Sequence, residues 1–404
     1  MRVLLLCNKS PWPKREGGSI AMNAMVNGLL QAGHTVKVLA ANTNKYRVEP
    51  KSIPADFALN TQIEFVELDL SLRINAALYT LIAGKSYHIT RFHTKDFETK
   101  ITQVLTEQQF DIVQIETLQM ATYLDLIRKH TKAPVVLRAH NIEHRIWQRI
   151  ADNTSNPLKK AYLRQLCRTL KQFELITLRK MDGIVAITPV DAQDIASLTE
   201  HPHIISIPFG INLEHIPLQP EKTVDVSLFH IGAMNWMPNA EGIAWFLEQV
   251  WPMVNRRMPD LKLHLAGRYM PDWLLKLQAP NVMVEGEVPE VWQYMMQYAV
   301  MIVPLFSGSG IRIKIVEAMA AGKAIVTTAI GAEGINCVDG KHLLVANDAA
   351  AFADAVVELC NNPALIKSLG DSAKVLIADE HNNARLMDRL TAFYAMLLDK
   401  KSER

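Results

Sequence analysis

Residues 307–328 have the sequence SGSGIRIKIVEAMAAGKAIVTT. The pattern predicts the end of a strand, a glycine-rich loop, a short helix over 313–321, a glycine cap and a further strand over 324–328. Backbone N–H groups in such a loop and at the start of its helix suit phosphate oxygens or sugar hydroxyls. The stretch therefore predicts an α/β fold with a site for an anionic or sugar ligand at this loop.

Three side chains in the stretch suit such a ligand. Arg312 and Lys314 can neutralise the charge of a phosphate group. Glu317 falls farther along the helix, where its carboxylate can accept hydrogen bonds from two neighbouring hydroxyls, such as those of a ribose. A purely structural alternative stays open, because Lys314 can be solvated and Glu317 can pair locally.

The same strand–helix rhythm extends over the whole chain and predicts parallel strands joined by crossover helices. We expect two doubly wound, Rossmann-like domains, over 1–207 and 208–380, and a C-terminal helix over 381–404 that can pack back on the first domain. The Pro-rich stretch from Pro208 fits a hinge. The expected strands are 2–7, 35–40, 63–68, 111–116, 134–139, 183–187, 203–207, 225–231, 261–266, 281–285, 299–304, 324–328 and 343–345. The expected helices include 19–32, 158–180, 239–256, 289–297, 313–321, 349–360, 363–370 and 383–398.

The composition is that of an ordinary globular protein, with 404 residues, 49% hydrophobic and 21% charged. It excludes disordered, collagen-like and coiled-coil classes. The four cysteines form no CxxC pair and lie in apolar segments, as expected of core residues in a reducing compartment. The first apolar run is too short for a signal peptide, and the others fall well below the roughly 20 residues of a membrane-spanning helix. We therefore expect a cytoplasmic protein, with peripheral contact at the inner face of the plasma membrane as an open alternative.

Charge is divided unevenly along the chain. Residues 1–210 carry 26 basic and 19 acidic residues, a net charge of +7, whereas residues 211–404 carry 17 and 22, a net charge of −5. Such an asymmetry is expected if the first half faces an anionic partner, whether a membrane surface, a nucleic acid or a phosphorylated substrate. An uneven scatter of solvated charges is the alternative.

Two further segments follow expected strands. Gly17 and Gly18 open the helix after the first strand, where backbone N–H groups can bind an anion. Their spacing is neither GxGxxG nor that of a P-loop, and a plain turn is the alternative. His140 comes directly after strand 134–139, at the edge where doubly wound sheets bind ligands. It is a candidate catalytic residue; a structural histidine, or a zinc site shared with His144, is the alternative.

These segments together resemble the retaining family-4 glycosyltransferases of the GT-B fold. The resemblance covers nearly the whole chain, and its subtype is that of bacterial enzymes that build surface polysaccharide or lipopolysaccharide from nucleotide-sugars. It implies two domains facing a central cleft. The motifs that carry it are the 307–328 stretch, the Gly17–Gly18 loop, RAHNIEH over 138–144, PFGIN over 208–212, HIGAMNWMPN over 230–239 and LAG over 265–267.

The resemblance implies roles for residues of the glycine-rich loop. Glu317 matches the second glutamate of the family's donor-binding motif and is expected to hold the nucleotide ribose. The first glutamate position is Ser309 in this chain. Ser309 and the backbone amides of Gly310 and Ile311 are therefore the expected contacts of the transferred sugar.

A second departure follows Gly232, which is expected to bind the donor. Many family members carry an arginine and a lysine after this glycine, and they clamp the diphosphate. This chain has Ala233 and Asn239 at the approximate positions. We therefore expect Arg312 and Lys314 to supply the positive charge and to act on the leaving group.

The remaining implied roles lie elsewhere in the chain. Gly286 to Val288 resembles the stretch whose backbone contacts the base, Gly17 and Gly18 are expected near the donor, and Arg268 is a reserve cation. His140 matches the family histidine at the acceptor side of the cleft. Its expected role is to contact the donor sugar or to polarise the reacting centre.

The implied reaction moves a glycosyl unit from a nucleoside diphosphate sugar to a hydroxyl of a glycan or lipid-linked acceptor, with retention of configuration. The donor is a co-substrate, and we expect no cofactor, no metal and no nucleic-acid partner; the chain contains no DxD sequence. A GT-B nucleotide-sugar 2-epimerase and a catalytically silent nucleotide-sugar-binding protein are the alternatives.

Overall fold

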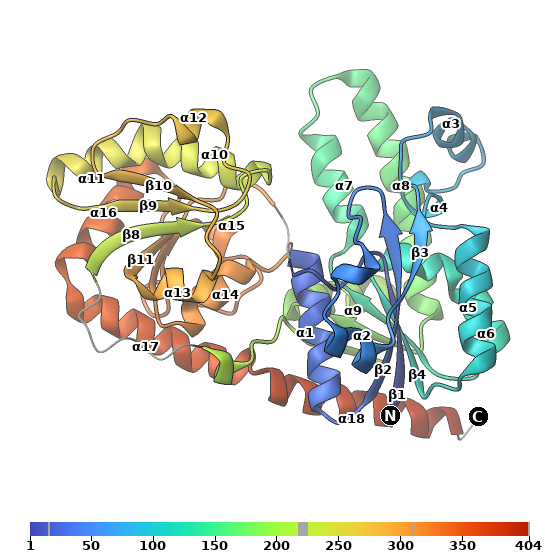
Figure 1. The fold of residues 1–404 in the computed structure, drawn as a ribbon. Coiled ribbons are helices and arrows are strands. Elements are labelled where there is room, and N and C mark those ends of the chain that lie inside the picture. The colour runs from blue at the N-terminus through green and yellow to red at the C-terminus, as the bar shows by residue number, and fades with distance from the viewer. Residues whose placement is uncertain (15–16, 217–224, 309, 403–404) are drawn as a thin grey trace. The chain divides into compact units, whose positions relative to one another are not determined.

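The computed structural model describes residues 1–14, 17–216, 225–308 and 310–402. The chain forms two compact units, Met1–Gly210 with Asn383–Arg404, and Ile211–Asn382. The sequence places the corresponding boundaries at residues 207 and 380, a few residues earlier in each case. Figure 1 shows the strands and helices of each unit, coloured by residue number.

The first unit contains a parallel sheet of seven strands: β1 (Arg2–Cys7), β2 (Thr35–Thr43), β3 (Glu64–Leu68), β4 (Ile112–Glu116), β5 (Val135–Ala139), β6 (Gly183–Ala186) and β7 (Ile204–Ser206). Their spatial order is β3-β2-β1-β4-β5-β6-β7. All seven expected strands are present. The side chains of β4 and β5 are buried throughout, as is typical of central strands covered on both faces.

Helices cover both faces of this sheet, so that the predicted doubly wound fold is confirmed. They are α1 (Gly17–Gln31), α2 (Ala55–Thr61), α3 (Ile74–Ile82), α4 (Tyr87–Thr90), α5 (Lys95–Glu107), α6 (Leu124–His130), α7 (Glu143–Asp152), α8 (Pro157–Lys180), α9 (Pro189–Thr199) and α18 (Asn383–Ser402). One apolar cluster joins the sheet to α5, α6, α8 and α9. A second joins the other face to α1, α2 and α18.

The last helix, α18, packs on the first unit beside α1. Its buried stripe includes Leu386, Leu390 and Leu397. Two glycines allow the close approach: a Cβ at Gly28 would lie 2.7 Å from Met387 Sδ, and one at Gly183 would lie 2.7 Å from Leu397 Cδ1. The core of the first unit is therefore completed by residues from the end of the chain.

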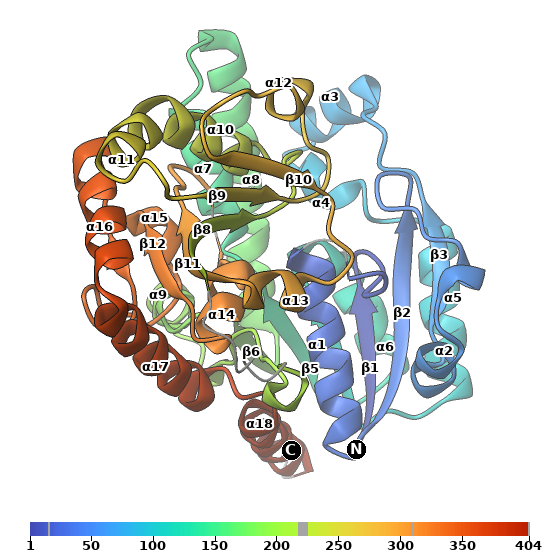
Figure 2. The same ribbon diagram turned by 60° about the vertical axis from the view of Figure 1, so that its left-hand side comes forward.

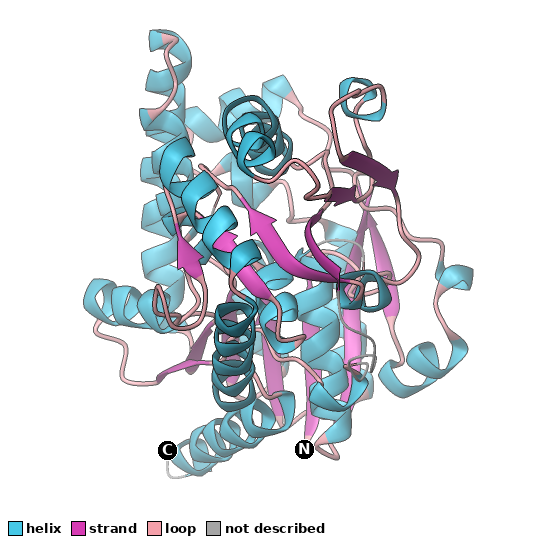
Figure 3. Ribbon diagram, turned by 90° about the vertical axis from the view of Figure 1, so that its left-hand side faces the viewer, coloured by secondary structure: helices cyan, strands magenta, loops and turns pink. Residues whose placement is uncertain are grey.

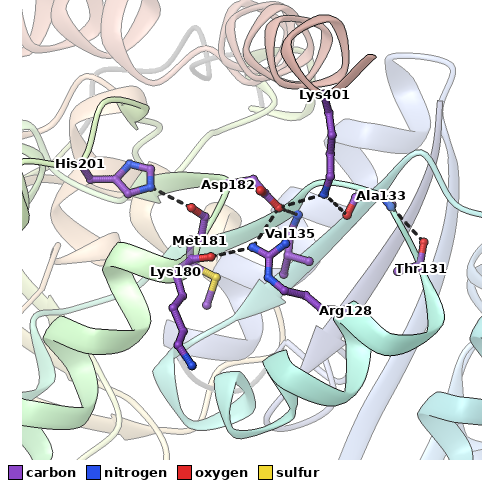
Figure 4. Close-up of polar contacts among 9 residues, drawn as sticks. All are labelled: Arg128, Thr131, Ala133, Val135, Lys180, Met181, Asp182, His201 and Lys401. Atoms are coloured by element: carbon purple, nitrogen blue, oxygen red, sulfur yellow. Dashed lines mark hydrogen bonds and ion pairs between the residues drawn. The ribbon is translucent and has the colours of Figure 1, made fainter. Parts of the chain in front are cut away.

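Polar contacts hold the last turn of α18 at the amino-terminal edge of the sheet. Lys401 Nζ lies 3.4 Å from Asp182 Oδ2 and donates to the Ala133 carbonyl over 3.1 Å (Figure 4). The same carboxylate accepts a hydrogen bond from the Val135 N–H at 2.7 Å and pairs with Arg128 Nη2 at 3.1 Å. Asp182 thus ties α18 to the start of β5 and to α6.

The second unit contains a parallel sheet of six strands: β8 (Asp225–Ile231), β9 (Leu263–Ala266), β10 (Val282–Gly286), β11 (Tyr298–Val303), β12 (Ala324–Thr327) and β13 (Leu344–Val345). Their spatial order is β10-β9-β8-β11-β12-β13. All six expected strands are present. From the centre of the sheet, β8 to β10 follow one another toward one edge and β11 to β13 toward the other. The strands β8 and β11 are therefore direct neighbours in the sheet.

The helices of this unit are α10 (Met237–Trp245), α11 (Trp251–Arg257), α12 (Asp272–Leu275), α13 (Val291–Met296), α14 (Ile313–Ala320), α15 (Ala329–Ala332), α16 (Ala349–Asn361) and α17 (Pro363–Glu380). Figures 2 and 3 show them around the strands. A π-helical segment, Phe246–Val250, separates α10 from α11 within the expected single helix. The expectation for 363–370 was too short, because α17 continues to Glu380 and buries Ala373 and Ile377.

Within the part of the chain that the structure describes, no helix is long and apolar enough to cross a membrane.

The packing of α18 predicts a stability effect at Leu390, whose side chain is fully buried. Leu390→Ala should lower the free energy of unfolding by about 2–5 kcal/mol, because it removes buried methyl groups and leaves a cavity. Asp388→Ala, at an exposed position of the same helix, should change it by less than about 0.5 kcal/mol. Urea unfolding followed by circular dichroism gives both values, and equal values for the two variants would contradict the burial of this stripe.

Candidate active site

In the second unit, a glycine lies at the carboxyl end of each of three adjacent strands, so that backbone without side chains lines this edge of the sheet. Gly232 follows β8, Gly267 follows β9, and Gly286 ends β10. The Gly232 N–H donates to the Ala266 carbonyl over 3.1 Å, and the Gly267 N–H donates to the Gly286 carbonyl over 2.7 Å. A Cβ at Gly267 would lie 1.8 Å from the Gly232 carbonyl oxygen, so no side chain fits there. Two of the predicted donor residues, Gly232 and Gly286, thus share one sheet edge; Val288 follows two residues after Gly286 and is half-buried.

The Lys314 ammonium group lies beside Gly232. Lys314 Nζ donates to Asn239 Oδ1 over 2.6 Å and lies 3.4 Å from His230 Nε2. A Cβ at Gly232 would lie 3.1 Å from Lys314 Nζ and 2.7 Å from Asn239 Nδ2. The first turn of α14 therefore places a cation where the glycine leaves the backbone accessible, and neutral side chains hold it.

The hydrogen bonds of His230 define its tautomer. His230 is fully buried, and its Nδ1 lies 2.8 Å from the Ile302 carbonyl, an acceptor to which Nδ1 must donate. Burial and the neighbouring Lys314 hold the pKa of His230 well below its ordinary value. The ring is therefore neutral, and its Nε2 lone pair faces the Lys314 ammonium.

Lys314 titrates near neutral pH. Burial, and then the charge of Arg312, lower the pKa of Lys314 to about 7. An anion beside the ammonium would favour its charged form. The group is consequently able to gain a proton when a phosphate binds.

Arg312 is also buried, but its guanidinium is engaged by protein groups. It donates to the carbonyl of Gly310 and, over 3.4 Å, to that of Ile330. Its Nη2 lies 4.0 Å from Glu333 Oε2, and the guanidinium lies 5.9 Å from the Trp236 ring centre. Arg312 therefore stabilises the loop before α14, and its direct contact with phosphate stays a prediction.

The structure describes the other predicted residues of the glycine-rich loop and of α14, except Ser309. Gly310 has a φ of 74°, a conformation that suits glycine. Ile311 is half-buried, and Glu317 is half-buried in the second turn of α14. Ser309 lies outside the described residues. The proposed contacts of these residues with the ribose and the sugar stay predictions.

In the first unit, His140 is joined to a carboxylate of the neighbouring strand. Glu116 ends β4 and His140 directly follows β5, and these two strands are paired. His140 Nε2 lies 2.6 Å from Glu116 Oε2. Arg138 Nη1 lies 3.3 Å from the same oxygen and donates to the Ala21 carbonyl of α1 over 3.2 Å.

Glu116 is an ionised, fully buried carboxylate. Burial alone raises the pKa of Glu116, but the charge of Arg138 and the hydrogen bonds of His140 and Gln114 outweigh burial, so that the net shift is downward. An ionised carboxylate only accepts hydrogen bonds. His140 Nε2 therefore carries a proton, and its Nδ1 is the ring nitrogen that remains for other contacts.

Gly17 and Gly18 form the first turn of α1, as expected. A Cβ at Gly18 would lie 2.9 Å from both Cε and Nζ of Lys9. The Lys9 ammonium also lies 4.5 Å from the centre of the Tyr46 ring. The start of α1 is therefore accompanied by a cation that the sequence motif did not indicate.

His144 has a different environment from His140. His144 Nδ1 lies 2.6 Å from Glu174 Oε2, and the backbone N–H groups of Glu143 and His144 donate to the Glu174 carboxylate. The two histidines of the HNIEH segment thus face different carboxylates. Among the described residues, no group of three or more histidine, cysteine, aspartate or glutamate side chains is arranged to hold a metal ion.

A cavity of about 930 Å³ lies in the first unit between the end of β3, α3, α4 and α8. Its lining combines charged side chains, among them Asp69, Arg73 and Arg91, with the aromatic rings of Tyr79 and Phe173. None of the predicted site residues lines it. Hydroxyl-rich ligands suit such a mixture, because both acceptors and donors stand beside aromatic faces.

The predicted site residues therefore form two groups, one in each unit. The first unit holds Gly17, Gly18 and His140, and the second holds Gly232, Gly286, Val288, Gly310, Ile311, Arg312, Lys314 and Glu317. Sequence reasoning missed Glu116 and His230. Glu116 ends an apolar run, IVQIE, which is a weak signal, since its importance depends on which strand lies next to β4.

Two family models match the chain. The model described as Glycosyltransferase Family 4 matches residues 16–215, and the one described as Glycosyl transferases group 1 matches residues 225–362. The chain belongs to the GT-B glycosyltransferases. The predicted GT-B fold is thereby confirmed, and each family model falls on one of the two sheets.

Individual relatives of this GT-B glycosyltransferase are distant in sequence but similar over their full length. It is 20% identical over 400 residues to an uncharacterised 44.6 kDa protein of the cps region of Klebsiella pneumoniae, with 96% of this chain and 98% of that protein covered. Sucrose-phosphate synthase from Thermosynechococcus elongatus superposes with a TM-score of 0.71 at 15% identity, covering 99% of this chain and 100% of the other. Anabaena HepE in complex with UDP superposes with a TM-score of 0.69 at 11% identity, covering 98% and 100%.

The pKa of Lys314 predicts a pH dependence of donor binding by this glycosyltransferase. Lys314 is charged below about pH 7 and largely neutral above it. The affinity for an added nucleoside diphosphate should therefore weaken as pH rises, by up to about tenfold for each pH unit above that value. Isothermal titration calorimetry from pH 6 to about pH 9 in two buffers of different ionisation enthalpy would also detect proton uptake.

Lys314→Met is the matched variant for this measurement. It should bind the donor more weakly at pH 6 and should lose most of the pH dependence. An unchanged pH dependence in this variant would assign the proton to another group.

Proposed function

We propose that the protein is a retaining, metal-independent glycosyltransferase that moves a hexosyl-type unit from a nucleoside diphosphate sugar to a hydroxyl of a glycan or lipid-linked acceptor. The observation that carries the proposal is the Lys314 ammonium, held by neutral partners beside the bare backbone at Gly232. A diphosphate needs a cationic donor of this kind, and the absence of a side chain at Gly232 lets it come close. The UDP in the HepE structure supports a nucleoside diphosphate sugar as the donor. The cps region of the Klebsiella relative supports a role in cell-surface polysaccharide assembly.

The proposed mechanism stabilises the leaving group. Lys314 and the backbone amides of Gly310 and Ile311 bind the diphosphate as negative charge develops on it, which is the largest electrostatic demand of the step. Gly232 has no side chain and so lets the diphosphate come close to the Lys314 ammonium. Glu317 holds the ribose diol. The C–O bond between sugar and phosphate breaks while the acceptor oxygen approaches the same face, and a donor phosphate oxygen takes the acceptor proton. No protein nucleophile is required.

On the acceptor side, we assign His140 to the reacting centre. Its Nδ1 is available for the sugar, because Glu116 engages Nε2 at 2.6 Å. Because Nε2 donates to Glu116, Nδ1 can accept a hydrogen bond from a hydroxyl group at the reacting centre. The cavity lined by Asp69, Arg73 and Tyr79 offers the same unit a polar surface for a glycan acceptor.

The test of this proposal combines binding and turnover. A thermal-shift screen selects the nucleotide-sugar that most stabilises the protein, and slow release of nucleoside diphosphate from that donor reports on transfer to water. Glu317→Ala should lose most donor binding, whereas His140→Ala should keep it and lose at least about 100-fold in kcat, the range of a lost acid or base group. The readouts are calorimetry and nucleoside diphosphate release.

Two exposed residues supply controls: Glu241→Ala on α10 and His130→Ala on α6 should behave like the wild type. Interconversion of sugars without diphosphate release would instead indicate an epimerase. Tight donor binding without either reaction would indicate a silent binding protein. Wild-type turnover of His140→Ala would indicate that His140 has only a structural role.

We further propose that the first unit contacts an anionic membrane through the tip formed by α7, α8 and α3. At the start of α8, Leu158 is 83% exposed and Tyr162 is 39% exposed. They alternate with the exposed bases Lys159, Arg164 and Arg168. Such a mixture of apolar and basic side chains favours the interface of an anionic bilayer.

The neighbouring helix α3 adds to this surface. Its Ala76 packs against an apolar cluster that includes Ala151 of α7 and Leu163 of α8, and Trp147 of α7 packs against the same cluster. Tyr79 and Ile82 of α3 remain exposed. Figures 1 and 2 show α3 and the α7–α8 pair at the same end of the first unit. The exposed bases Lys159, Arg164 and Arg168 are thus accompanied by exposed apolar side chains of both α8 and α3.

Vesicle cosedimentation tests this membrane contact. The protein should bind vesicles that contain phosphatidylglycerol at low salt, and binding should fall with added salt. The double variant Lys159→Glu with Arg164→Glu should bind at least about tenfold more weakly, since each base near the surface contributes about 1 kcal/mol. The charge-matched control is Lys262→Glu with Lys341→Glu, two exposed positions in the second unit. Equal loss in both double variants would indicate scattered surface charge rather than a docking surface.

A further inference from the structure

A chain of hydrogen bonds runs from the C-terminal helix to His140. Tyr394 of α18 donates from its hydroxyl to Gln114 Oε1 of β4. Gln114 Nε2 donates to Glu116 Oε1 over 2.6 Å, and Glu116 Oε2 lies 2.6 Å from His140 Nε2. Tyr394, Gln114 and Glu116 are all fully buried. The chain of hydrogen bonds therefore crosses the interior of the first unit, and its first bond joins residues 280 positions apart in sequence.

The direction of every hydrogen bond in this chain follows from Glu116. Its ionised carboxylate accepts only, so both His140 Nε2 and Gln114 Nε2 must donate to it. The Gln114 amide is then oriented with Oε1 away from Glu116, and this buried oxygen needs a donor. Burial and the charge of Glu116 raise the pKa of Tyr394 well above its ordinary range, so its hydroxyl keeps the proton that Oε1 requires.

We propose that Tyr394 is a positioning residue for His140. Through Gln114 it holds the Glu116 carboxylate at the place and angle that keep the His140 ring in its Nε2–H tautomer, with Nδ1 directed to the reacting centre. The inference rests on the proposed role of His140. A phenylalanine at position 394 would leave Gln114 Oε1 buried without its donor, and the amide would then be free to rotate away from Glu116.

The positioning role of Tyr394 links the geometry of His140 to the C-terminal helix. Tyr394 lies on the segment that follows the second unit in sequence, since α17 ends at Glu380 and α18 begins at Asn383. Its helix is seated on the first unit by the apolar stripe and by the contact between Lys401 and Asp182 (Figure 4). The geometry of His140 thus depends on whether this last helix is seated.

The test compares two buried tyrosines of the full-length protein. Tyr394→Phe should lower kcat about tenfold, a loss typical of partners that orient a functional histidine, while KM for the donor changes less than about twofold. Tyr123→Phe is the matched control, because the Tyr123 hydroxyl also donates in the interior of the first unit, to the Phe92 carbonyl over 2.6 Å, but outside this chain. It should retain wild-type kcat.

A spectroscopic readout separates positioning from stability. With ¹⁵N-labelled histidine, and His140→Gln to assign the signal, the wild type should show an Nε2–H ring at His140. Tyr394→Phe should show both tautomers or an averaged signal, and Tyr123→Phe should show the wild-type signal. Lys401→Met removes the contact with Asp182 but leaves the apolar stripe that seats α18, so it should leave the tautomer unchanged.

The outcomes are distinguishable from those of the proposed function. Equal kcat and an unchanged His140 signal in Tyr394→Phe would overturn the positioning role, even if His140→Ala is inactive. An Nδ1–H ring in the wild type would overturn it as well. If His140→Ala retains full turnover while Tyr394→Phe changes the tautomer, the hydrogen-bond chain stands and the proposed role of His140 in the reaction falls.

Discussion

A buried carboxylate dominates the architecture of the first unit. Glu116 has no exposed surface and remains ionised, which an interior tolerates only when its charge is compensated and its oxygens are hydrogen-bonded. Arg138 on the next strand and His140 directly after that strand contact one carboxylate oxygen, and Gln114 on the same strand as Glu116 donates to the other. Tyr394 on the last helix donates in turn to Gln114. This requirement makes the pairing of β4 with β5 and the return of α18 parts of one arrangement. The fold and the candidate site are therefore stabilised by the same contacts.

The second unit handles charge in the opposite way. The cation of Lys314 has neutral neighbours, the Asn239 amide and the His230 ring, in place of a carboxylate. A cation that is positioned but not neutralised keeps its electrostatic potential for a ligand. This arrangement also gives the departure at position 239 a physical reason. The resemblance implies a lysine there, and in this chain the asparagine instead receives the ammonium of a lysine that comes from α14.

Sequence reasoning reached the elements of the fold because each is encoded locally. Apolar runs such as VLLL in β1 and VVL in β5 predicted their strands, and the glycine-rich stretch predicted α14 and its flanking loop. For the same reason, the hydrogen-bond partners of the candidate site residues could not be predicted from the sequence. Nothing in IVQIE says that β5 will lie beside it, and nothing near Tyr394 points to Gln114. Such contacts arise from strand order and from the seating of a distant helix, which a local pattern does not contain.

Arg312 and Lys314 illustrate how one short segment divides two tasks between two cations. Arginine keeps its charge at any ordinary pH and offers a planar fork of donors, which suits the carbonyls of Gly310 and Ile330. Lysine is a point charge whose pKa responds to its surroundings, and Arg312 is one of the causes that lower it here. The ligand-free site therefore avoids two full charges at close range, because Lys314 is partly neutral near pH 7. An arriving diphosphate would reverse that balance, since its charge favours the ammonium form. A variant in which these two residues are exchanged should therefore lose both functions. A lysine at position 312 cannot donate to two carbonyls from one planar group. An arginine at position 314 cannot lose its proton when the ligand leaves.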